Sequence, residues 1–389
     1  MANNKQFPEI RFSGFTDAWE QRKLNTFSTY SSSPLTNNDI NENGEYDLYD
    51  ANGVVGKTNK SPNIVNYISI IKDGAGVGRV RKLPKNTSIL GTMGAIIPNN
   101  SNYDFLYVLL ENTEFNKLTS GGTIPHIYFK QYSEELYYIP ELSEQQQIGA
   151  YFRTLDNLIT LHQRECDKLM ITKKSMLEKM FPKNNEVVPE IRFSGFTDAW
   201  EQRKLSEFVD KAVDNRGKTP PLDENGTHPL IEVAALGGVH PDYTKVEKYL
   251  NDNSFENNLR AYIKEGDILF TTVGSIGLVS LMDSREEAAI AQNIVAFRAK
   301  ENYVPEYLYA LFSNEDNQYK ATRIVMGAVQ PSIKVSQLVD VEYMLTENVE
   351  EQTKIGAYFS NLDNLITLHQ RELEKLNNIK KSMLEKMFV

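Results

Sequence analysis

The chain has 389 residues, of which 40% are hydrophobic and 24% charged, and its formal net charge is −10. These proportions are those of a soluble globular protein with room for two or three domains. No stretch approaches the roughly 20 apolar residues of a membrane span, and the first residues lack the apolar run of a signal peptide. The single cysteine, Cys166, excludes a disulfide framework and a cysteine-based zinc site, so we expect a cytoplasmic protein without membrane contact.

The negative net charge taken alone argues against nucleic-acid binding, but phosphate contacts are made by local patches. Residues 56–85 contain such a patch, in which Asp73 is the only acidic residue. Its basic residues are Lys57, Lys60, Lys72, Arg79, Arg81, Lys82 and Lys85. The second half of the chain has no comparable run.

Two segments occur twice, and these repeats set the domain organisation. Residues 8–24, PEIRFSGFTDAWEQRKL, recur unchanged at 189–205, and we call each copy box A. Residues 144–181 agree with residues 351–388 at 29 of 38 positions. The regions between, 25–143 and 206–350, differ in sequence, and we call them the first and the second module. The predicted domains are residues 1–143, a helix over 144–181, residues 182–350 with a linker at 182–188, and a helix over 351–389.

The two modules share a skeleton although their sequences differ. Residues 67–83 and 266–282 each predict a strand, a glycine turn and a second strand. Residues 104–115 and 305–316 predict short helices, the second with proline at its first position. A proline-centred loop followed by a strand is expected at 123–129 and at 329–335. Each module is therefore predicted to be one α+β domain. The aromatic residues of box A are expected to pack the base of the module against a helix end, or to form a docking face: Phe12, Phe15, Trp19, Phe193, Phe196 and Trp200.

The repeated segments 144–181 and 351–388 predict two long amphipathic helices. Each has a narrow apolar seam flanked by charged residues, which needs a partner helix, and two nearly identical seams predict that the helices pack on each other. The alternative is a pair of ordinary amphipathic helices in a bundle. The predicted packing residues are Ile148, Phe152, Leu155, Ile159, His162, Leu169, Met176, Ile355, Phe359, Leu362, Ile366, His369, Leu376 and Met383. His162 and His369 occupy the same heptad position, where polar side chains that fix the register are favoured over a metal site.

Together these elements predict an α+β fold. It has two globular α+β target-recognition domains related by pseudo-twofold symmetry and separated by two long antiparallel coiled-coil helices. A seam of about 33 residues would span roughly 50 Å at the rise of an α-helix.

One motif suggests nucleotide chemistry. ANGVVGKT at 51–58 fits a relaxed phosphate-loop pattern, with Ala51 in place of the first glycine. That loop needs a buried strand before it and a helix after it, and neither flank has this character, so a surface turn carrying Lys57 and Lys60 is favoured. The glycines at 74–78 lack dinucleotide-fingerprint spacing and favour a hairpin turn. No catalytic or metal-ligand pattern is present in the sequence, which therefore predicts a non-catalytic protein that itself binds no cofactor or metal.

The order of these pieces resembles the specificity subunits of type I restriction–modification systems. The resemblance rests on both copies of box A, DANG at 50–53, NRGKTP at 215–220, GAGVGRV at 74–80, VGSIGLV at 273–279, and the EQ…IGAYF segment that leads each long helix. It implies that each module reads one half of a bipartite DNA sequence. It also implies that the helices set the spacing and dock two methyltransferase subunits that use S-adenosylmethionine. Two motor (restriction) subunits, where present, would use ATP and Mg²⁺.

The resemblance also implies which loop residues face double-stranded DNA. In the first module they are Asn52, Lys57, Thr58, Asn59, Lys60, Arg79 and Arg81; in the second they are Arg216, Lys218, Thr219, Thr272, Ser275, Gln292, Asn293 and Gln330. Arg and Lys suit guanine or phosphate, Asn and Gln suit adenine, and Ser and Thr suit either. The first module departs from the family at 27–39, where the second has the more typical sequence 209–220.

Two other functions stay open. The chain could be a coiled-coil scaffold without sequence readout, or a nucleotide-using nuclease that relies on ANGVVGKT.

Overall fold

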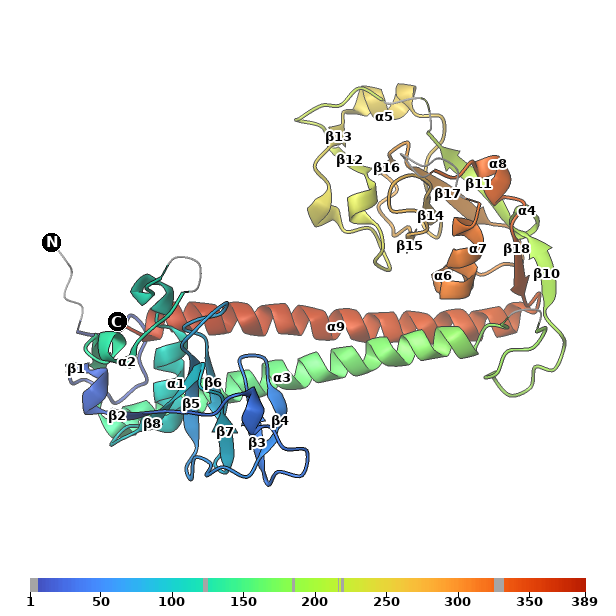
Figure 1. Ribbon diagram of the computed structural model, residues 1–389. Coiled ribbons are helices and arrows are strands. Elements are labelled where there is room, and N and C mark those ends of the chain that lie inside the picture. Colours follow the sequence, from blue (N-terminus) through green and yellow to red (C-terminus); the bar gives the residue numbers. More distant parts are fainter. Residues whose placement is uncertain (1–5, 122–124, 184–185, 216, 218–219, 325–331) are drawn as a thin grey trace. The chain divides into compact units, whose positions relative to one another are not determined.

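The computed structural model describes residues 6–121, 125–183, 186–215, 217, 220–324 and 332–389. Internal contacts divide the chain into two compact units. The first unit is Met1–Gln163 with Arg371–Val389, and the second is Arg164–Gln370 (Figure 1). Each unit therefore contains one module, one box A and part of each long helix.

The first unit mixes short strands with short helices. Its elements in chain order are β1 (Glu20–Lys23), η1 (Leu24–Thr26), β2 (Ser28–Ser32), η2 (Asn37–Asp39), β3 (Tyr46–Tyr49), β4 (Val54–Thr58), β5 (Tyr67–Ile71), β6 (Val80–Leu83), β7 (Thr87–Ile89), β8 (Met93–Pro98), α1 (Tyr103–Glu111), η3 (Phe115–Leu118), α2 (Phe129–Tyr132), β9 (Leu136–Ile139) and the start of α3 (Leu142–Lys179).

The second unit has a matching series. Its elements are β10 (Glu201–Lys204), α4 (Leu205–Phe208), β11 (Val209–Asp214), β12 (His228–Ile231), η4 (Val233–Ala235), η5 (Tyr243–Lys245), β13 (Tyr249–Leu250), α5 (Asp252–Asn258), β14 (Ile268–Thr271), β15 (Val279–Leu281), β16 (Ala289–Ile290), β17 (Ile294–Ala299), α6 (Pro305–Ser313), α7 (Glu315–Thr322), α8 (Val335–Leu338), β18 (Glu342–Leu345) and much of α9 (Val349–Met387).

The sheets of the two units have the same topology. The first unit has a four-stranded antiparallel sheet β2-β8-β5-β6, a sheet β4-β3-β7 in which β3 and β7 are parallel, and a pair β1-β9. The second unit has β11-β17-β14-β15, β13-β12-β16 with β12 and β16 parallel, and β10-β18. The predicted α+β class and the likeness of the two modules are therefore confirmed. The first module also begins on an equivalent strand, β2, despite its unusual sequence at 27–39.

Each predicted hairpin is present. β5 pairs with β6 and β14 pairs with β15, both antiparallel, on either side of the glycine turns. Gly78 has φ +85°, and a Cβ there would lie 2.5 Å from Cβ of Phe115, so only glycine fits. The short helices predicted from sequence are α1 and α6, and Pro305 begins α6.

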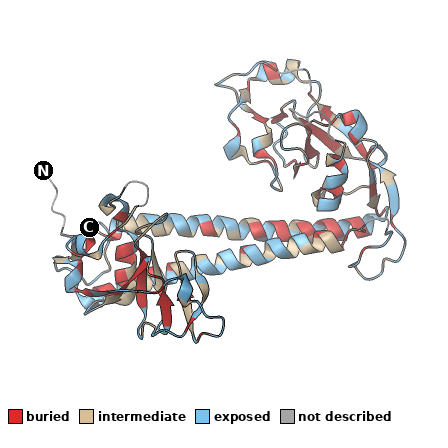
Figure 2. Cartoon of the chain, in the orientation of Figure 1, coloured by how far each residue is buried: buried red, intermediate tan, exposed pale blue. Residues whose placement is uncertain are grey.

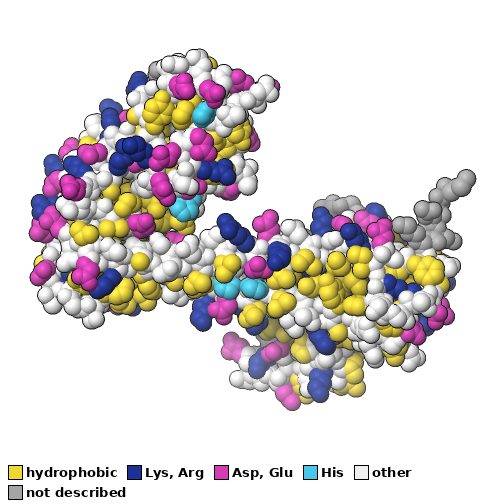
Figure 3. All heavy atoms as spheres, turned by 180° about the vertical axis from the view of Figure 1, so that it is seen from behind, with side chains coloured by type: hydrophobic (Ala, Val, Ile, Leu, Met, Phe, Trp, Pro, Cys, Tyr) yellow, Lys and Arg dark blue, Asp and Glu magenta, His cyan; other side chains and the backbone are white. Residues whose placement is uncertain are grey.

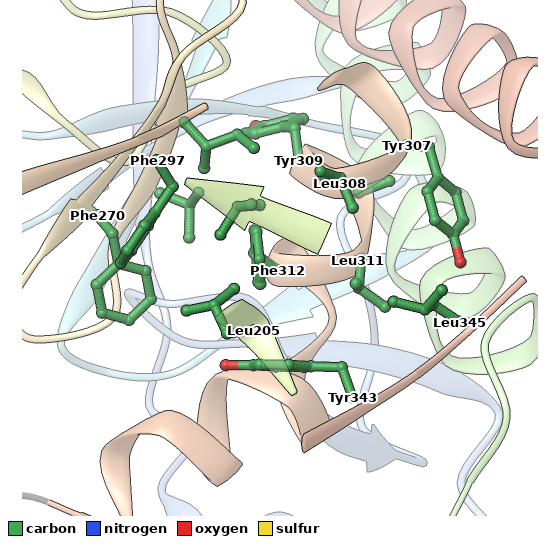
Figure 4. Packing of buried hydrophobic residues seen from close by; sticks show 14 of the residues in the cluster. Leu205, Phe270, Phe297, Tyr307, Leu308, Tyr309, Leu311, Phe312, Tyr343 and Leu345 are labelled. Carbon is green, nitrogen blue, oxygen red and sulfur yellow. The ribbon is translucent and has the colours of Figure 1, made fainter. Parts of the chain in front are cut away.

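The cores lie between the four-stranded sheets and these short helices. In the second unit, Leu308, Leu311 and Phe312 of α6 face Phe270 and Phe297 of the sheet (Figure 4). Buried residues are concentrated in the strands of each module (Figure 2). Every residue of β5 is buried, which agrees with its sequence YISII, in which only Ser69 is not hydrophobic.

In the described parts of the strands predicted at 123–129 and 329–335, residues 125–129 and 332–335, no strand is formed. In the part of these segments that the structure describes, His126 and Ser332 make isolated bridges to Asp73 and Val273. The chain then turns directly into α2 and α8. Each helix begins three residues after the bridging residue, so no strand ladder extends from the bridge. The buried Ile127 and Ile333 instead donate backbone hydrogen bonds to Lys72 and Thr272, next to the glycine turns.

The long helices run antiparallel within each unit. In the first unit the start of α3, with Ile148, Phe152 and Leu155, shares a core with Met387 and the partly buried Leu376, Ile379, Met383 and Leu384 near the end of α9. In the second unit the end of α3, with Leu177, Met180 and the partly buried Leu169 and Met176, shares a core with Ile355, Phe359 and Leu362 near the start of α9. Ile366, Cys166 and Leu373 are also buried, whereas Ile159, His162 and His369 are half-buried.

Candidate nucleic-acid interface

Box A fixes each module to the start of a long helix through a buried ion pair. Arg11 donates two hydrogen bonds of 2.7 Å to the carboxylate of Glu144, which is fully buried. Arg192 binds Glu351 in the same way, at 2.6 and 2.9 Å. The hydrogen bond to Glu144 raises the pKa of Arg11 above its usual value. A bidentate pair of this kind sets orientation as well as distance.

The next residue of each helix completes the joint. Gln145 accepts a hydrogen bond from the backbone N–H of Asn102 at 3.0 Å and donates one to the carbonyl of Pro140 at 2.9 Å. Gln352 accepts from Val304 N–H and donates to the carbonyl of Thr346, both at 2.9 Å. The sequence marked these residues only as parts of two repeated segments, box A and EQ…IGAYF, and did not predict the bonds between them.

The box A tryptophans close the base of each module. Trp19 packs edge-on against Phe105 of α1 and Phe388 beyond the end of α9. Trp200 packs edge-on against Tyr307 of α6 and Phe181 beyond the end of α3. The prediction that box A aromatics pack against helix ends is confirmed for these two residues.

The motif at 51–58 is a turn followed by a strand. Asp50 Oδ1 accepts hydrogen bonds from the backbone N–H groups of Asn52 and Gly53, and β4 then pairs with β3. Lys57 lies on β4, so the expectation of a turn carrying it was wrong, and only Lys60 follows the strand. No helix follows this strand before β5, so the motif lacks the helix N-terminus that a phosphate loop requires.

Two predicted DNA contacts of the first module hold this turn in place. The guanidinium groups of Arg79 and Arg81 both donate to the carbonyl of Ala51, Arg81 at 3.3 Å. The glycine turn at 74–78 and the turn at 50–53 therefore form one continuous edge of the module. Asn52 and Arg79 are exposed on it, and Arg81 is half-buried. Lys57, Asn59 and Lys60 are exposed on β4 and just after it.

Two predicted contacts are excluded by burial. Thr58 is 1% exposed and its hydroxyl accepts a hydrogen bond from Lys60 N–H. Thr272 is fully buried, and its hydroxyl and backbone N–H both donate to the carbonyl of Asn293, the hydroxyl at 3.2 Å. Both threonines stabilise loops and cannot present a hydroxyl to DNA.

In the second module the hydrogen bonds from Thr272 to the carbonyl of Asn293 join the glycine turn to the segment between β16 and β17. Ser275 is exposed in the turn, Gln292 is exposed in the segment, and Asn293 is half-buried beside it. Arg216, Lys218, Thr219 and Gln330 lie outside the described residues. Acidic and basic side chains are intermingled over the face of this unit drawn in Figure 3.

Among the described residues there is neither a metal-binding cluster nor a membrane-spanning helix. No group of three or more His, Cys, Asp or Glu side chains is placed to hold a metal ion. No helix in the part of the chain that the structure describes is both long and apolar enough to cross a membrane.

The sequence and the fold both match proteins of known type. The family model described as type I restriction modification DNA specificity domain matches residues 16–170 and 197–378. The type I restriction enzyme MjaVIII specificity subunit of Methanocaldococcus jannaschii is 25% identical over 98% of this chain and 94% of its own length. The MjaIX specificity subunit of the same organism is 31% identical over 49% of this chain and 44% of its own length.

A solved structure shares the whole fold. The crystal structure of the type I restriction-modification system S subunit from M. genitalium has a TM-score of 0.68 at 17% identity. The match covers 98% of this chain and 99% of that one.

Two α+β modules, each fixed by box A to a long repeated helix, define a class of DNA-specificity proteins. The chain belongs to the type I restriction modification DNA specificity family. It is a specificity subunit of a type I restriction–modification system.

Proposed function

We propose that each module reads one half of a bipartite DNA target, and that the paired helices set the distance between the two halves. The observation that carries this proposal is the contrast between shared topology and unlike loops. The sheet orders and the Arg–Glu and Gln joints are the same in both units. The exposed edges differ, with Asn52, Lys60 and Arg79 in one module and Ser275 and Gln292 in the other. A common scaffold with different edges suits two different half-sites.

The decisive experiment exchanges one module. Adenine methylation is mapped genome-wide in cells that carry the methyltransferase partner, with and without this chain. Residues 25–143 are then replaced by the first module of a relative. We expect a bipartite motif that needs this chain, and a change in only one half after the exchange. A change in both halves would contradict the assignment of one module to one half-site, and a scaffold without readout would give no motif at all.

We further propose that the helices dock two methyltransferase subunits. The supporting observation is that four leucines at equivalent repeat positions are exposed: Leu158 and Leu161 on α3, and Leu365 and Leu368 on α9, with exposures of 39, 54, 45 and 55%. Apolar side chains in repeated positions outside the helix seam suit two copies of the same partner. The chain would then supply sequence choice and assembly in the cytoplasm and bind no cofactor of its own. Its partners would bring S-adenosylmethionine and, where motor subunits join, ATP and Mg²⁺.

Docking is tested by placing a charge on this surface. Leu161→Glu and Leu368→Glu together should weaken co-purification of the methyltransferase by at least tenfold, because a buried unpaired charge is costly at an interface. Thr160→Glu, at an exposed neighbouring position on α3, is the matched control and should retain the partner. Equal retention by all variants would place the docking surface elsewhere.

The nuclease alternative has a direct test. It requires the purified chain to hydrolyse ATP and to lose that activity on Lys57→Ala. Because 51–58 is a turn and a strand without a following helix, we expect no hydrolysis above a blank.

A further inference from the structure

A hollow of about 320 Å³ lies in the first module. Its walls come from the end of β2 and the residues after it, from the segment after β4, and from β7. The polar residues that line it are Ser31, Ser32, Ser33, Lys60, Ser61, Asn63 and Ser88. No carboxylate lines the hollow.

Ser88 is the residue that marks the hollow as a binding site. Its side chain is 3% exposed, and its Oγ has no hydrogen-bond partner among the described residues. A buried hydroxyl left without a partner destabilises the folded chain, so native proteins rarely keep one without a use. The corresponding strand of the second unit, β16, consists of Ala289 and Ile290 and has no hydroxyl.

The chemistry of the walls favours an anion. Serine hydroxyls donate hydrogen bonds to phosphate oxygens, and Lys60 adds a positive charge on a flexible side chain. Asn59 and Lys60 are exposed in the segment after β4, within the basic run at 56–85. Asn63 also lines the hollow, but its side-chain amide already donates to the carbonyl of Thr87 at 3.5 Å, whereas reading a base edge needs a planar amide or guanidinium group that is free to pair.

We propose that this hollow binds one phosphate of the DNA backbone beside the half-site read by the first module, with Ser88 and Lys60 as its main ligands. The inference rests on the proposed function, because it assumes that the first module contacts DNA. It adds a phosphate anchor that fixes the register of this module and has no counterpart on β16 of the second.

The first test separates binding from folding. Ser88→Ala removes the unpartnered hydroxyl and adds no atom to this buried position. We expect the variant chain, in complex with its methyltransferase partner, to have an unchanged or higher Tm and an affinity for target duplex about tenfold lower, as for a lost hydrogen bond to a charged group. A purely structural serine would give an unchanged affinity.

The second test locates the phosphate. Target duplexes that each carry a single methylphosphonate are titrated with the wild-type complex and with the Ser88→Ala and Lys60→Gln complexes. One position should weaken the wild type and leave both variants unaffected. Lys60→Gln should also reduce the slope of log affinity against log salt by about 1. Lys85→Gln, an exposed lysine of the same run that does not line the hollow, controls for general loss of charge at the mapped position.

The outcomes also separate the two proposals. If the complex prefers its target but Ser88→Ala and Lys60→Gln show the wild-type methylphosphonate pattern, the hollow is not a phosphate site, and the proposed function stands. If the complex shows no preference among duplexes, the proposed function fails on that ground. If it binds no duplex, both fail.

Discussion

Glu144 and Glu351 are carboxylates with no exposed surface, each held by a single arginine of box A. A buried charge is tolerated only when it is paired, and removal of one partner leaves the other uncompensated. Each pair therefore adds little net stability, but breaking it would destabilise the joint between module and helix strongly. At this scale the structure goes beyond sequence reasoning, which found both segments but not the bond between residues 133 positions apart.

Removal of the arginine tests this lock. Arg11→Ala should destabilise the first unit by about 3–5 kcal/mol, because Glu144 stays buried without a partner. Urea unfolding followed by tryptophan fluorescence measures the loss, since Trp19 lies in this unit and Trp200 in the other. Arg192→Ala should produce the same loss in the second unit only. The double variant Arg11→Met with Glu144→Leu should recover most of the stability, and failure to recover would show that the arginine acts through other contacts.

The sequence prediction was also wrong for two threonines, which are buried and do not face DNA. Thr58 ends β4 and Thr272 follows β14, and both were predicted to face DNA. Short loops beside strands reverse the side to which a side chain points within one residue, so a pattern of polar letters cannot separate Thr58 from its exposed neighbours Lys57 and Asn59. Which of these side chains is buried depends on the strand that pairs with β4, and the local sequence does not show that pairing.

Among the elements, the long helices have charged residues within their packed faces. Lys173 of α3 binds Asp363 of α9 at 2.6 Å in the second unit, and the side chains are 18% and 6% exposed. In the first unit Lys380 of α9 binds Asp156 of α3 and Glu111 of α1, both at 2.8 Å. Such pairs fix which residues of two antiparallel helices meet, because a shifted register would bury the charges alone.

Lys173→Met should show this role and a pH dependence. Burial raises the pKa of Asp363 and Lys173 opposes that rise, so without the lysine the folded-state pKa should lie further above the unfolded value near 3.9. A raised carboxyl pKa means that the folded state binds more protons, and stability then falls as pH rises through the folded pKa. We expect a loss of about 3–5 kcal/mol at neutral pH that becomes smaller as the pH is lowered toward 4.

Urea unfolding at several pH values measures this difference between variant and wild type. Lys174→Met is the matched control, because Lys174 is the next residue and its pair with Glu315 is exposed, so its removal should cost at most about 1 kcal/mol at any pH. A loss for Lys173→Met that does not change with pH would mean that Asp363 is not the group left unpaired.

At the element scale the sequence predicted most of what is present. Glycine turns between β-branched runs predicted β5-β6 and β14-β15, and the seams predicted α3 and α9 to within two residues at their starts. The pairs β1-β9 and β10-β18 were not predicted, because each joins strands more than a hundred residues apart and the box A strand EQRK has no alternating apolar pattern. The strands expected at 123–129 and 329–335 are absent from the described residues. These segments do have apolar residues, but Ile127 and Ile333 are buried in a loop and not in a sheet.

At the scale of the whole molecule, the repeats in the sequence were the strongest predictor. They identified two modules of one topology before any strand was placed. The contacts that would read DNA were the weakest part of the prediction, because exposed loop residues are not constrained by packing and leave no periodic signal.

The length of the helices should control the target. Removal of one heptad (about 7 residues) from 155–176, and of the equivalent heptad from its repeat, keeps the seams in phase. It shortens the pair by about 10 Å, close to three base pairs of DNA. Methylation mapping should then find a shorter gap with both half-sites unchanged, or no motif if the modules no longer face the same side of the duplex. An unchanged gap would contradict the role of the helices in spacing.

The division of the chain into units has a consequence for synthesis. The second unit is one continuous segment, Arg164–Gln370, whereas the first unit needs Arg371–Val389. On a ribosome that adds about 5–20 residues per second, roughly ten to forty seconds pass between the last residue of its larger segment and the arrival of the smaller one. During that interval Trp19, Phe105 and Phe152 lack Phe388, which completes their cluster. The module made first is thus the last to be finished, and a chain cut short near its end loses the first module while the second is already complete.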